Sequence, residues 1–171
     1  MNIQTIILGG GCFWSIEATM QQLQGVEKIE TGYANGNIKN PNYRLVSNGD
    51  TGFAEVVKVY FNTQKINLQT LIHVFMTIHN PSVINKQGAD FGTQYRSVIV
   101  YNNESQYKDA KNAIKEMKLN VEIVLEPLKN YYKAEEYHQG YYNKNQYAGY
   151  CVAVINPQIN NLKNNFSHLI K

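Results

Sequence analysis

The chain has 171 residues, of which 43% are hydrophobic and 17% are charged. This balance excludes a disordered chain, and no apolar run is long enough to cross a membrane. The formal net charge of +3 neither requires nor excludes a nucleic-acid partner. We expect a single domain over residues 1–171, without a signal peptide, in the cytosol, where thiols are kept reduced.

The first half of the chain predicts three strands and two helices. Residues 3–9 form an apolar, strand-like run, and residues 12–23 predict a helix because Ile16, Met20 and Leu23 recur at helical spacing. Residues 26–34 and 53–61 predict two further strands, and residues 68–79 a second helix that ends before Asn80-Pro81. The long loop over residues 35–52 is rich in Asn and Gly, and long loops in compact domains are usually functional.

The second half completes a recognisable order. We expect a loop over residues 84–94, a strand over 95–101, a charged helix over 104–118 and a strand over 121–127. The order β-α-β-β-α-β predicts an α+β fold with a ferredoxin-like split βαβ core. This is a two-layer sandwich with a mixed or antiparallel sheet and helices on one face. An irregular Tyr-rich segment over residues 131–150 and a helix after Pro157 follow.

Three glycines precede one of the two cysteines, in the stretch GGGCFW over residues 9–14. Glycine permits backbone angles that other residues avoid and leaves amide groups open. Cys12 then lies at a helix N-terminus, where the dipole favours the thiolate, the reactive form of cysteine. Phe13 and Trp14 predict an aromatic pocket beside the thiol. The alternative is a buried structural cysteine whose aromatic neighbours pack in the core.

Alternation along residues 53–61 places Phe53, Glu55 and Val57 on the more apolar side of the strand. A charge there is costly, so the Glu55 carboxyl can keep its proton and act as a general acid. A carboxylate that stays in water or pairs with a lysine fits the alternation equally well. Tyr33 and Tyr95 flank glycine-bearing loops and can donate hydrogen bonds to a ligand oxygen, although most of the thirteen tyrosines must be structural.

Five motifs together resemble one family. They are GGGCFWSIEA, TGYANG, TGFAEVVKVYF, QGADFGTQYRS and AEEYHQGYY, in this order, from about residue 5 to about residue 160. They resemble motifs of the A-type peptide methionine sulfoxide reductases. The resemblance implies a single catalytic domain that reduces the S epimer of methionine sulfoxide, free or in proteins.

The resemblance also implies residue roles. Cys12 would attack the sulfoxide sulfur and end as a sulfenic acid, and Glu55 would protonate the sulfoxide oxygen. Tyr33 and Tyr95 would hydrogen-bond to that oxygen. The substrate would be bound by three further residues, Phe13, Trp14 and Asp90.

Regeneration would use thiols alone, because the family uses no metal and no organic cofactor. Thioredoxin or a glutaredoxin system would be the final reductant, and we expect a monomer. Cys151 is the candidate resolving cysteine, but its apolar neighbours over residues 152–155 equally suggest a core cysteine.

Two positions depart from the family pattern. Phe53 stands where the family usually has His, and Asn35-Gly36 replaces a Gly-Gly. We expect Phe53 to make the surroundings of Glu55 drier. His73 and His79 lie six apart and do not form a metal pair, and we expect His138 to hold structure around the site.

Other functions remain open at this point. A different cysteine-dependent enzyme, peroxidase-like or acyl-transferring, would use the same thiol, although acyl transfer needs a His base. A non-catalytic module could bind methionine through Phe13 and Trp14. A nucleic-acid-binding domain is a third alternative, but the basic residues of helix 104–118 are interrupted by acids.

Overall fold

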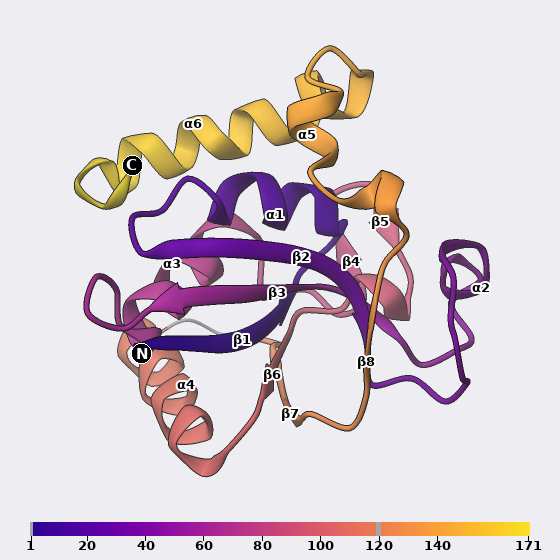
Figure 1. Ribbon diagram of the computed structural model, residues 1–171, viewed down its shortest axis with the longest axis horizontal. Coiled ribbons are helices and arrows are strands. Elements are labelled where there is room, and N and C mark those ends of the chain that lie inside the picture. The colour runs from indigo at the N-terminus through magenta and orange to yellow at the C-terminus, as the bar shows by residue number, and fades with distance from the viewer. Residues whose placement is uncertain (1, 119–120) are drawn as a thin grey trace.

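A six-stranded mixed sheet forms the centre of the computed structural model, which describes residues 2–118 and 121–171 (Figure 1). The strand order is β7-β6-β1-β3-β2-β8. Neighbouring strands are antiparallel except for β6 and β7, which are parallel. The strands are β1 (Ile3–Gly9), β2 (Val26–Ala34), β3 (Ala54–Asn62), β6 (Val98–Tyr101), β7 (Val124–Pro127) and β8 (Tyr131–Lys133).

Helices α1 (Phe13–Met20), α3 (Leu68–Ile78) and α4 (Glu104–Met117) cover one face of the sheet. Their apolar side chains join those of β1 and β3 in one large core that includes Ile16, Phe61 and Phe75. The opposite face carries a smaller cluster around Ile7 and Val56. The order β1-α1-β2-β3-α3-β6, with β1 and β3 central, confirms the predicted split βαβ arrangement.

Short elements fill the segments that the sequence predicts as loops. The β4–β5 hairpin and the Tyr-rich stretch over residues 131–150 show no clear periodicity in the sequence, because elements of two to five residues are too short to display one. The elements are α2 (Tyr43–Ser47), β4 (Lys86–Gln87), β5 (Asp90–Phe91), the 3₁₀ turns η1 (Thr93–Tyr95), η2 (Glu136–His138) and η4 (Ser167–Leu169), α5 (Tyr141–Lys144) and the π-helical η3 (Cys151–Ile155). The helix predicted after Pro157 is present as α6 (Asn156–Asn165). The strand predicted from residue 95 therefore begins only at Val98.

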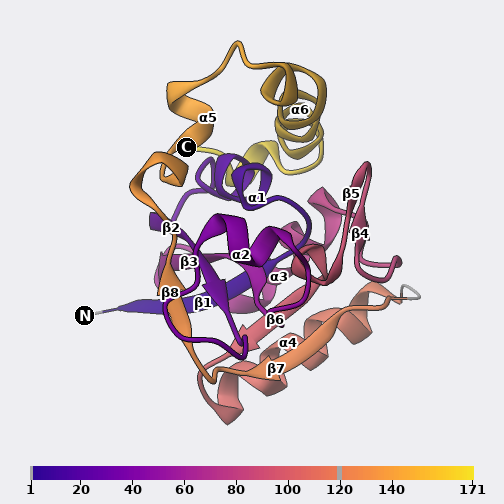
Figure 2. The ribbon, with the colours of Figure 1, turned by 90° about the vertical axis from the view of Figure 1, so that its right-hand side faces the viewer.

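The C-terminal segment lies on the outer side of α1. In Figures 1 and 2, α5 and α6 lie beyond α1, away from the strands, so that α1 is enclosed between the sheet and this segment. Pro157 stands in the first turn of α6, where its missing N–H costs nothing. The nucleophile candidate at the start of α1 is thus covered from both sides.

Strand register brings candidate residues together. Tyr33 of β2 lies opposite Glu55 of β3, and directly opposed residues of paired strands share one face. Phe53, Val57 and Phe61 belong to the large core on the helix-covered face, so the predicted alternation of β3 is confirmed. Glu55 is therefore directed into the layer that contains α1.

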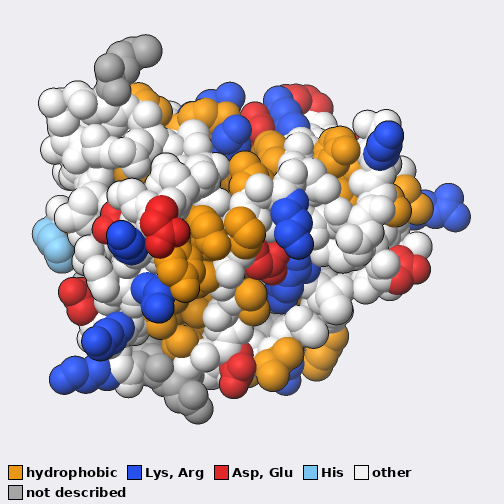
Figure 3. All heavy atoms as spheres, turned by 90° about the horizontal axis from the view of Figure 1, so that it is seen from below, with side chains coloured by type: hydrophobic (Ala, Val, Ile, Leu, Met, Phe, Trp, Pro, Cys, Tyr) orange, Lys and Arg blue, Asp and Glu red, His pale blue; other side chains and the backbone are white. Residues whose placement is uncertain are grey.

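The outer surface shows no separation of charge on the side where α4 and β7 lie. On that side, Lys and Arg side chains alternate with Asp and Glu around a central group of hydrophobic side chains (Figure 3). Such an interspersed pattern is typical of a solvated face and does not favour a nucleic-acid interface. None of the described helices is both long and apolar enough to cross a membrane.

Candidate active site

The three glycines form a turn that is pressed against three different neighbours. A Cβ atom on Gly9 would lie 2.9 Å from the carbonyl oxygen of Glu55, and one on Gly10 would lie 2.6 Å from the His79 ring. Gly11 has a φ of +86° and a Cβ there would meet Gln87 at 2.7 Å. Only glycine allows both the backbone angle and these approaches. The turn is thereby fixed between β3, the end of α3 and the β4–β5 hairpin.

His79 supports this turn from below as a neutral ring. Its Nδ1 lies 2.5 Å from the Phe75 carbonyl oxygen, so Nδ1 carries the hydrogen, and Nε2 then accepts from Ser97 Oγ at 2.7 Å. Burial lowers the pKa of His79 to about 4. The ring is a structural support of the Gly10 backbone.

Cys12 and Glu55 meet at the start of α1. Cys12 occupies the N-cap position of the helix in an extended conformation, and the next backbone amide, that of Phe13, donates to Glu55 Oε1 at 3.2 Å. Glu55 is 1% exposed, and its Oε2 atom has no hydrogen-bond partner among the described residues. Two groups 43 positions apart in the sequence thus face the same point.

Burial decides the protonation of Glu55. It raises the pKa of this carboxyl to about 8, although the hydrogen bond from Phe13 N–H works in the opposite direction and a nearby Asp90 adds a smaller increase. The carboxyl is therefore largely protonated at neutral pH. Of the two arrangements that the sequence left open, the structure has the buried, unpaired acid.

The expectation that the helix start makes Cys12 a thiolate is wrong, because the pKa of its thiol is raised. Burial, and next the charge of Glu55, raise the pKa of Cys12 well above its usual value; the backbone amide of Trp14 and the hydroxyl of Tyr150 lower it less. The eight-residue helix α1 does not outweigh this desolvation. Because a protonated Glu55 carries no charge, the thiol ionises more readily while that acid keeps its proton.

Four tyrosines stand near this pair, and two of them, Tyr43 and Tyr150, were not singled out from the sequence. The Tyr33 hydroxyl, fully buried, donates to Glu135 Oε1 at 2.8 Å and is committed to that carboxylate. Tyr95 in η1 has a raised pKa because of burial and then of Glu55. Burial, followed by the charges of Glu55 and Cys12, also raises the pKa of Tyr43 in α2. Burial, the bond to Glu135 and then the charge of Glu55 raise the pKa of Tyr33, so these three tyrosines all lie near the reacting groups, and the Tyr33 hydroxyl is bonded to Glu135.

The signal for Tyr43 was present but weak. It follows Asn42 in the Asn-rich loop, and the Asn42 side chain accepts from the amide of Leu45 as an N-cap. An Asn before a short apolar run is a helix-start signal, but five residues show too little periodicity to be recognised.

Aromatic rings form the wall beside the thiol. Phe13 is buried, and the Trp14 ring stacks on Tyr141 with a centroid separation of 3.7 Å and an interplanar angle of 6°. Trp14 Nε1 donates to His138 Nδ1 at 3.0 Å, which fixes the indole. Burial lowers the pKa of His138, so the ring stays neutral and acts as an acceptor. His138 thus has the supporting position expected of it.

A cavity of about 220 Å³ opens beside Cys12 on the hairpin side. Asp90 lines it and accepts a hydrogen bond from the Tyr150 hydroxyl at 3.1 Å; the same hydroxyl lies 3.3 Å from Ser15 Oγ. Tyr150 was not singled out from the sequence, because one tyrosine among thirteen in an irregular segment carries no pattern. It connects the C-terminal segment to the mouth of this cavity.

Cys151 follows Tyr150 in the chain, but it does not line this cavity. Its side chain is fully buried in a cluster with Ala18, Ile155 and Ile159, and burial raises its pKa. Ala18 is about 9 Å along the helix axis from Cys12 at 1.5 Å per residue. Both cysteines are free thiols.

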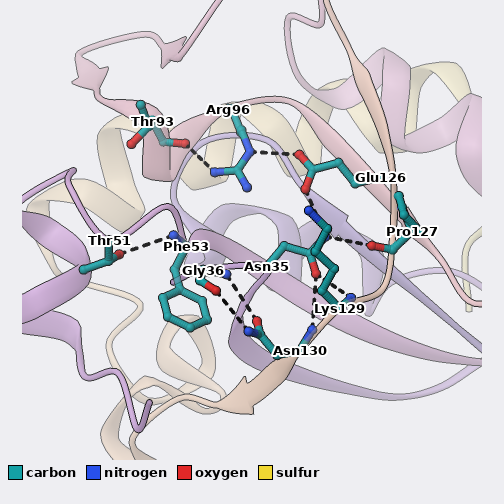
Figure 4. Close-up of polar contacts among 10 residues, drawn as sticks. All are labelled: Asn35, Gly36, Thr51, Phe53, Thr93, Arg96, Glu126, Pro127, Lys129 and Asn130. Carbon is teal, nitrogen blue, oxygen red and sulfur yellow. Dashed lines mark hydrogen bonds and ion pairs between the residues drawn. The ribbon is translucent and has the colours of Figure 1, made fainter. Parts of the chain in front are cut away.

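The two departures from the family pattern lie together at the end of β2 and the start of β3 (Figure 4). Asn35 has a φ of 59°, and its side chain contacts Glu126, Pro127 and the amides of residues 129 and 130. The Phe53 ring lies so close over Gly36 that a Cβ there would be 2.0 Å from it. Phe53 is buried and packs edge-on against Tyr132, which closes this side of the strand pair.

No group of three or more His, Cys, Asp or Glu side chains in the described ranges 2–118 and 121–171 could hold a metal ion. The chemistry that these residues can perform is nucleophilic attack by sulfur with proton donation from a buried carboxyl.

Known proteins with this sequence pattern share one description. A family model described as Peptide methionine sulfoxide reductase matches residues 4–170. A peptide methionine sulfoxide reductase MsrA of Trichodesmium erythraeum (strain IMS101) is 46% identical, over 96% of this chain and 96% of that protein. The MsrA of Acinetobacter baumannii (strain AYE) is 45% identical, over 99% of each.

Several solved structures share this fold. The reduced form of Mxr1 from Saccharomyces cerevisiae superposes with a TM-score of 0.83 at 36% identity, covering 88% of this chain and 90% of that one. Methionine sulfoxide reductase A of Corynebacterium diphtheriae gives 0.81 at 29% identity, covering 86% and 77%. A structure of Mxr1 in complex with Trx2 gives 0.59 at 27% identity, covering 82% and 85%.

Proposed function

The chain belongs to the peptide methionine sulfoxide reductase family, and we propose that it performs this family's reaction with Cys12 as nucleophile and Glu55 as proton donor. The reaction is the reduction of methionine sulfoxide to methionine. The observation that carries the assignment of residues is the hydrogen bond from Phe13 N–H to Glu55, which holds a buried acid beside the thiol. For the stereochemistry we propose the S epimer.

The first step conserves atoms and electrons. As the Cys12 sulfur attacks the sulfoxide sulfur, Glu55 donates its proton to the sulfoxide oxygen, the thiol proton passes to the Glu55 carboxylate, and the S–O bond to the substrate breaks. The oxygen ends on Cys12 as a sulfenic acid, and methionine leaves as the thioether. The cysteine sulfur loses two electrons and the methionine sulfur gains them. A buried, protonated carboxyl with a pKa of about 8 suits this donation at neutral pH.

The surrounding side chains suit a polar oxygen next to a methyl group. Tyr43 and Tyr95 lie close enough to the Cys12–Glu55 pair for its charges to raise their pKa values, and they would donate hydrogen bonds to the sulfoxide oxygen. Phe13 and Trp14 would contact the S-methyl group, because their rings offer an apolar wall beside the thiol. Asp90, together with Tyr150, would bind the rest of the substrate at the cavity.

Regeneration would follow through a disulfide. Cys151 would attack the Cys12 sulfenic acid and release water, and a dithiol of the thioredoxin type would then reduce the Cys12–Cys151 bond. The complex of the similar Mxr1 with Trx2 supports thioredoxin as the reductant, with glutaredoxin as the second candidate. Because Cys151 is fully buried with Ala18, its segment would have to open before the sulfurs can approach.

An epimer-resolved assay tests the reaction. The unmodified protein should release methionine from the S epimer and leave the R epimer, and Cys12→Ser should lose turnover by about 10⁴-fold, the scale expected when a nucleophile is removed. A peroxidase would instead consume hydrogen peroxide faster than the sulfoxide. A non-catalytic binding module would release no methionine, and Cys12→Ser would leave its binding unchanged.

A stoichiometric reaction tests the regeneration step. One equivalent of sulfoxide added to the reduced protein, followed by mass spectrometry, should yield a Cys12–Cys151 disulfide. A Cys12 sulfenic acid that persists would show that Cys151 takes no part.

A further inference from the structure

Helix α2, which carries Tyr43, is too short to be stable alone. It has five residues, whereas isolated helices shorter than about 12–15 residues are marginal in water. Val46 is its buried residue, and the Tyr43 ring lies against the His138 ring at 4.6 Å. The orientation of Tyr43 must therefore depend on contacts made by other parts of the chain.

The C-terminal end of α2 is tied to η1. Thr93 Oγ1 donates to the carbonyl oxygen of Gly49 at 2.8 Å, and Gln94 Nε2 donates to that of Ser47 at 3.3 Å. Gly49 has a φ of +79°, so the chain turns at the point that Thr93 holds. The next residue of η1 is Tyr95, the second tyrosine of the site.

Segment η1 is itself fixed to the nucleophile. The carbonyl oxygen of Tyr95 accepts from Gly11 N–H at 3.2 Å, within the turn before Cys12. Arg96 closes the segment by donating to the Thr93 carbonyl oxygen at 3.1 Å and to Glu126 at 3.2 Å (Figure 4). The bond from Thr93 to Gly49, two residues after the last residue of α2, therefore couples the position of Tyr43 to that of the thiol.

The N-terminal end of α2 is held by a carboxylate. Glu135 Oε2 accepts from the backbone N–H of Tyr43 at 3.0 Å, while its Oε1 accepts from the Tyr33 hydroxyl at 2.8 Å. Tyr33 is fully buried on β2, so Glu135 connects α2 to the central sheet. A charged acceptor makes such bonds shorter and stronger than neutral ones.

We propose that Thr93 and Glu135 are positioning residues that hold the two ends of the α2 segment and thereby fix the orientation of Tyr43, whose ring lies against His138. This inference rests on the proposed function, in which Tyr43 bonds the sulfoxide oxygen. Neither residue touches the reacting atoms, and both act through Tyr43.

The first experiment compares isosteric variants of one residue. Thr93→Val removes the hydroxyl, Thr93→Ser keeps it, and Thr63→Val is the matched control, since Thr63 Oγ1 also donates to a carbonyl, that of Asn2, in an exposed loop. The rate of methionine formation in a single turnover at saturating sulfoxide should fall about tenfold in Thr93→Val, because small misplacements of oxygen-binding groups have large effects. Thr93→Ser should restore the rate, and Thr63→Val should not change it.

A second readout separates positioning from general damage. The alkylation rate of Cys12 by iodoacetamide does not depend on a group that binds the sulfoxide oxygen, so it should stay within twofold in Thr93→Val. An equal loss of alkylation rate would show that Thr93 supports the thiol turn instead, and would overturn the proposal.

A double-mutant cycle shows whether Thr93 and Glu135 act through Tyr43. If Thr93 and Glu135 act through Tyr43, then Thr93→Val or Glu135→Gln should slow the reaction in the unmodified background but add nothing to Tyr43→Phe. Additive effects would overturn the inference while leaving the role of Tyr43 intact. A Tyr43→Phe variant with full single-turnover activity would instead overturn the role of Tyr43 in the proposed function, and the positioning role with it.

Discussion

The sheet core and the C-terminal segment, residues 134–171, place different parts of the site, and they do so by different means. Cys12 and Glu55 are fixed by β1, β3 and α1, whose side chains form a continuous buried core. Residues 134–171 contribute His138, Tyr150 and Cys151 and lie on the far side of α1. The groups whose bonds change are thus held by the core, and the groups that surround or regenerate them are held by an outer layer.

The outer layer is attached to the core by a small apolar cluster around Ala18 and Cys151, by Leu162, and by a set of polar contacts. Gly140 N–H donates to the buried Glu17 at 3.0 Å, Gln139 bonds both backbone groups of Thr31, and Trp14 bonds His138. A hydrogen bond contributes about 1 kcal/mol net, whereas one fully buried large apolar side chain contributes about 1.5–3 kcal/mol. Because the outer layer buries far fewer large apolar side chains than the core, it should open more readily, which suits a segment that must release a buried thiol.

The sharpest test of the core's role is Glu55→Gln. The amide keeps the size and the acceptor for Phe13 N–H but cannot donate an acidic proton, so the reduction step should slow by about 10²–10³-fold. In the unmodified protein the single-turnover rate should fall as the pH rises through about 8, the pKa to which burial raises Glu55, because the acid form is then lost. The variant should lack this fall, and its persistence would assign the proton to another group.

The same variant should slow the reaction but raise the free energy of unfolding at pH 8. A carboxyl with a raised folded-state pKa stabilises the fold below its unfolded pKa, about 4.3, and this contribution is lost as the pH rises toward about 8. Glu55→Gln should thus unfold at a higher urea concentration than the unmodified protein at pH 8, and the two should converge near pH 4.

A core substitution should separate stability from chemistry. Phe61 is fully buried on β3, so Phe61→Ala should lower the free energy of unfolding by about 3–5 kcal/mol, while the folded fraction keeps its single-turnover rate. Urea unfolding measures the first quantity. The matched control is Tyr147→Ala in the outer layer, where a side chain that is 96% exposed should contribute less than about 0.5 kcal/mol. Equal losses in both variants would remove the distinction between the two regions.

The core was predictable from the sequence because its signals are periodic. The bounds of β1 and β2 are those expected, and the alternation along β3 correctly placed Glu55 on the buried face with Phe53 and Val57. The glycine turn also identified the start of α1. A pattern that repeats every two or nearly four residues survives in the sequence of a single chain.

The outer layer and the loops were not predictable in the same way. Tyr43 lies on a helix too short for periodicity, and Tyr150 reaches Cys12 only because the chain returns across α1. The raised pKa of Cys12 is also a tertiary effect, since burial and Glu55 come from segments outside the local helix start. Such properties depend on distant contacts, which a local pattern does not encode.

A cysteine substitution tests whether the outer layer has a part in turnover. Cys151→Ser should leave the first turnover unchanged, because Cys151 does not face the reacting pair, but should lower the steady-state rate with thioredoxin about tenfold. Burst kinetics with excess sulfoxide would show one methionine released per enzyme, followed by the slower phase. Identical steady-state rates would make Cys151 a core residue, as its apolar neighbours also allow.

The smallest expected effect concerns the stack of Trp14 on Tyr141, which joins the two regions. Tyr141→Leu removes a ring that lies 3.7 Å from the indole but leaves the hydrogen bond from Trp14 to His138. An aromatic pair contributes about 0.5–1.5 kcal/mol, so KM for the sulfoxide should rise about three- to tenfold if the outer layer fixes the methyl-binding wall. Tyr141→Phe keeps the stacking and should behave as the unmodified protein. If instead KM stays constant while the free energy of unfolding falls, the core alone orients Trp14 and the outer layer serves only to cover it.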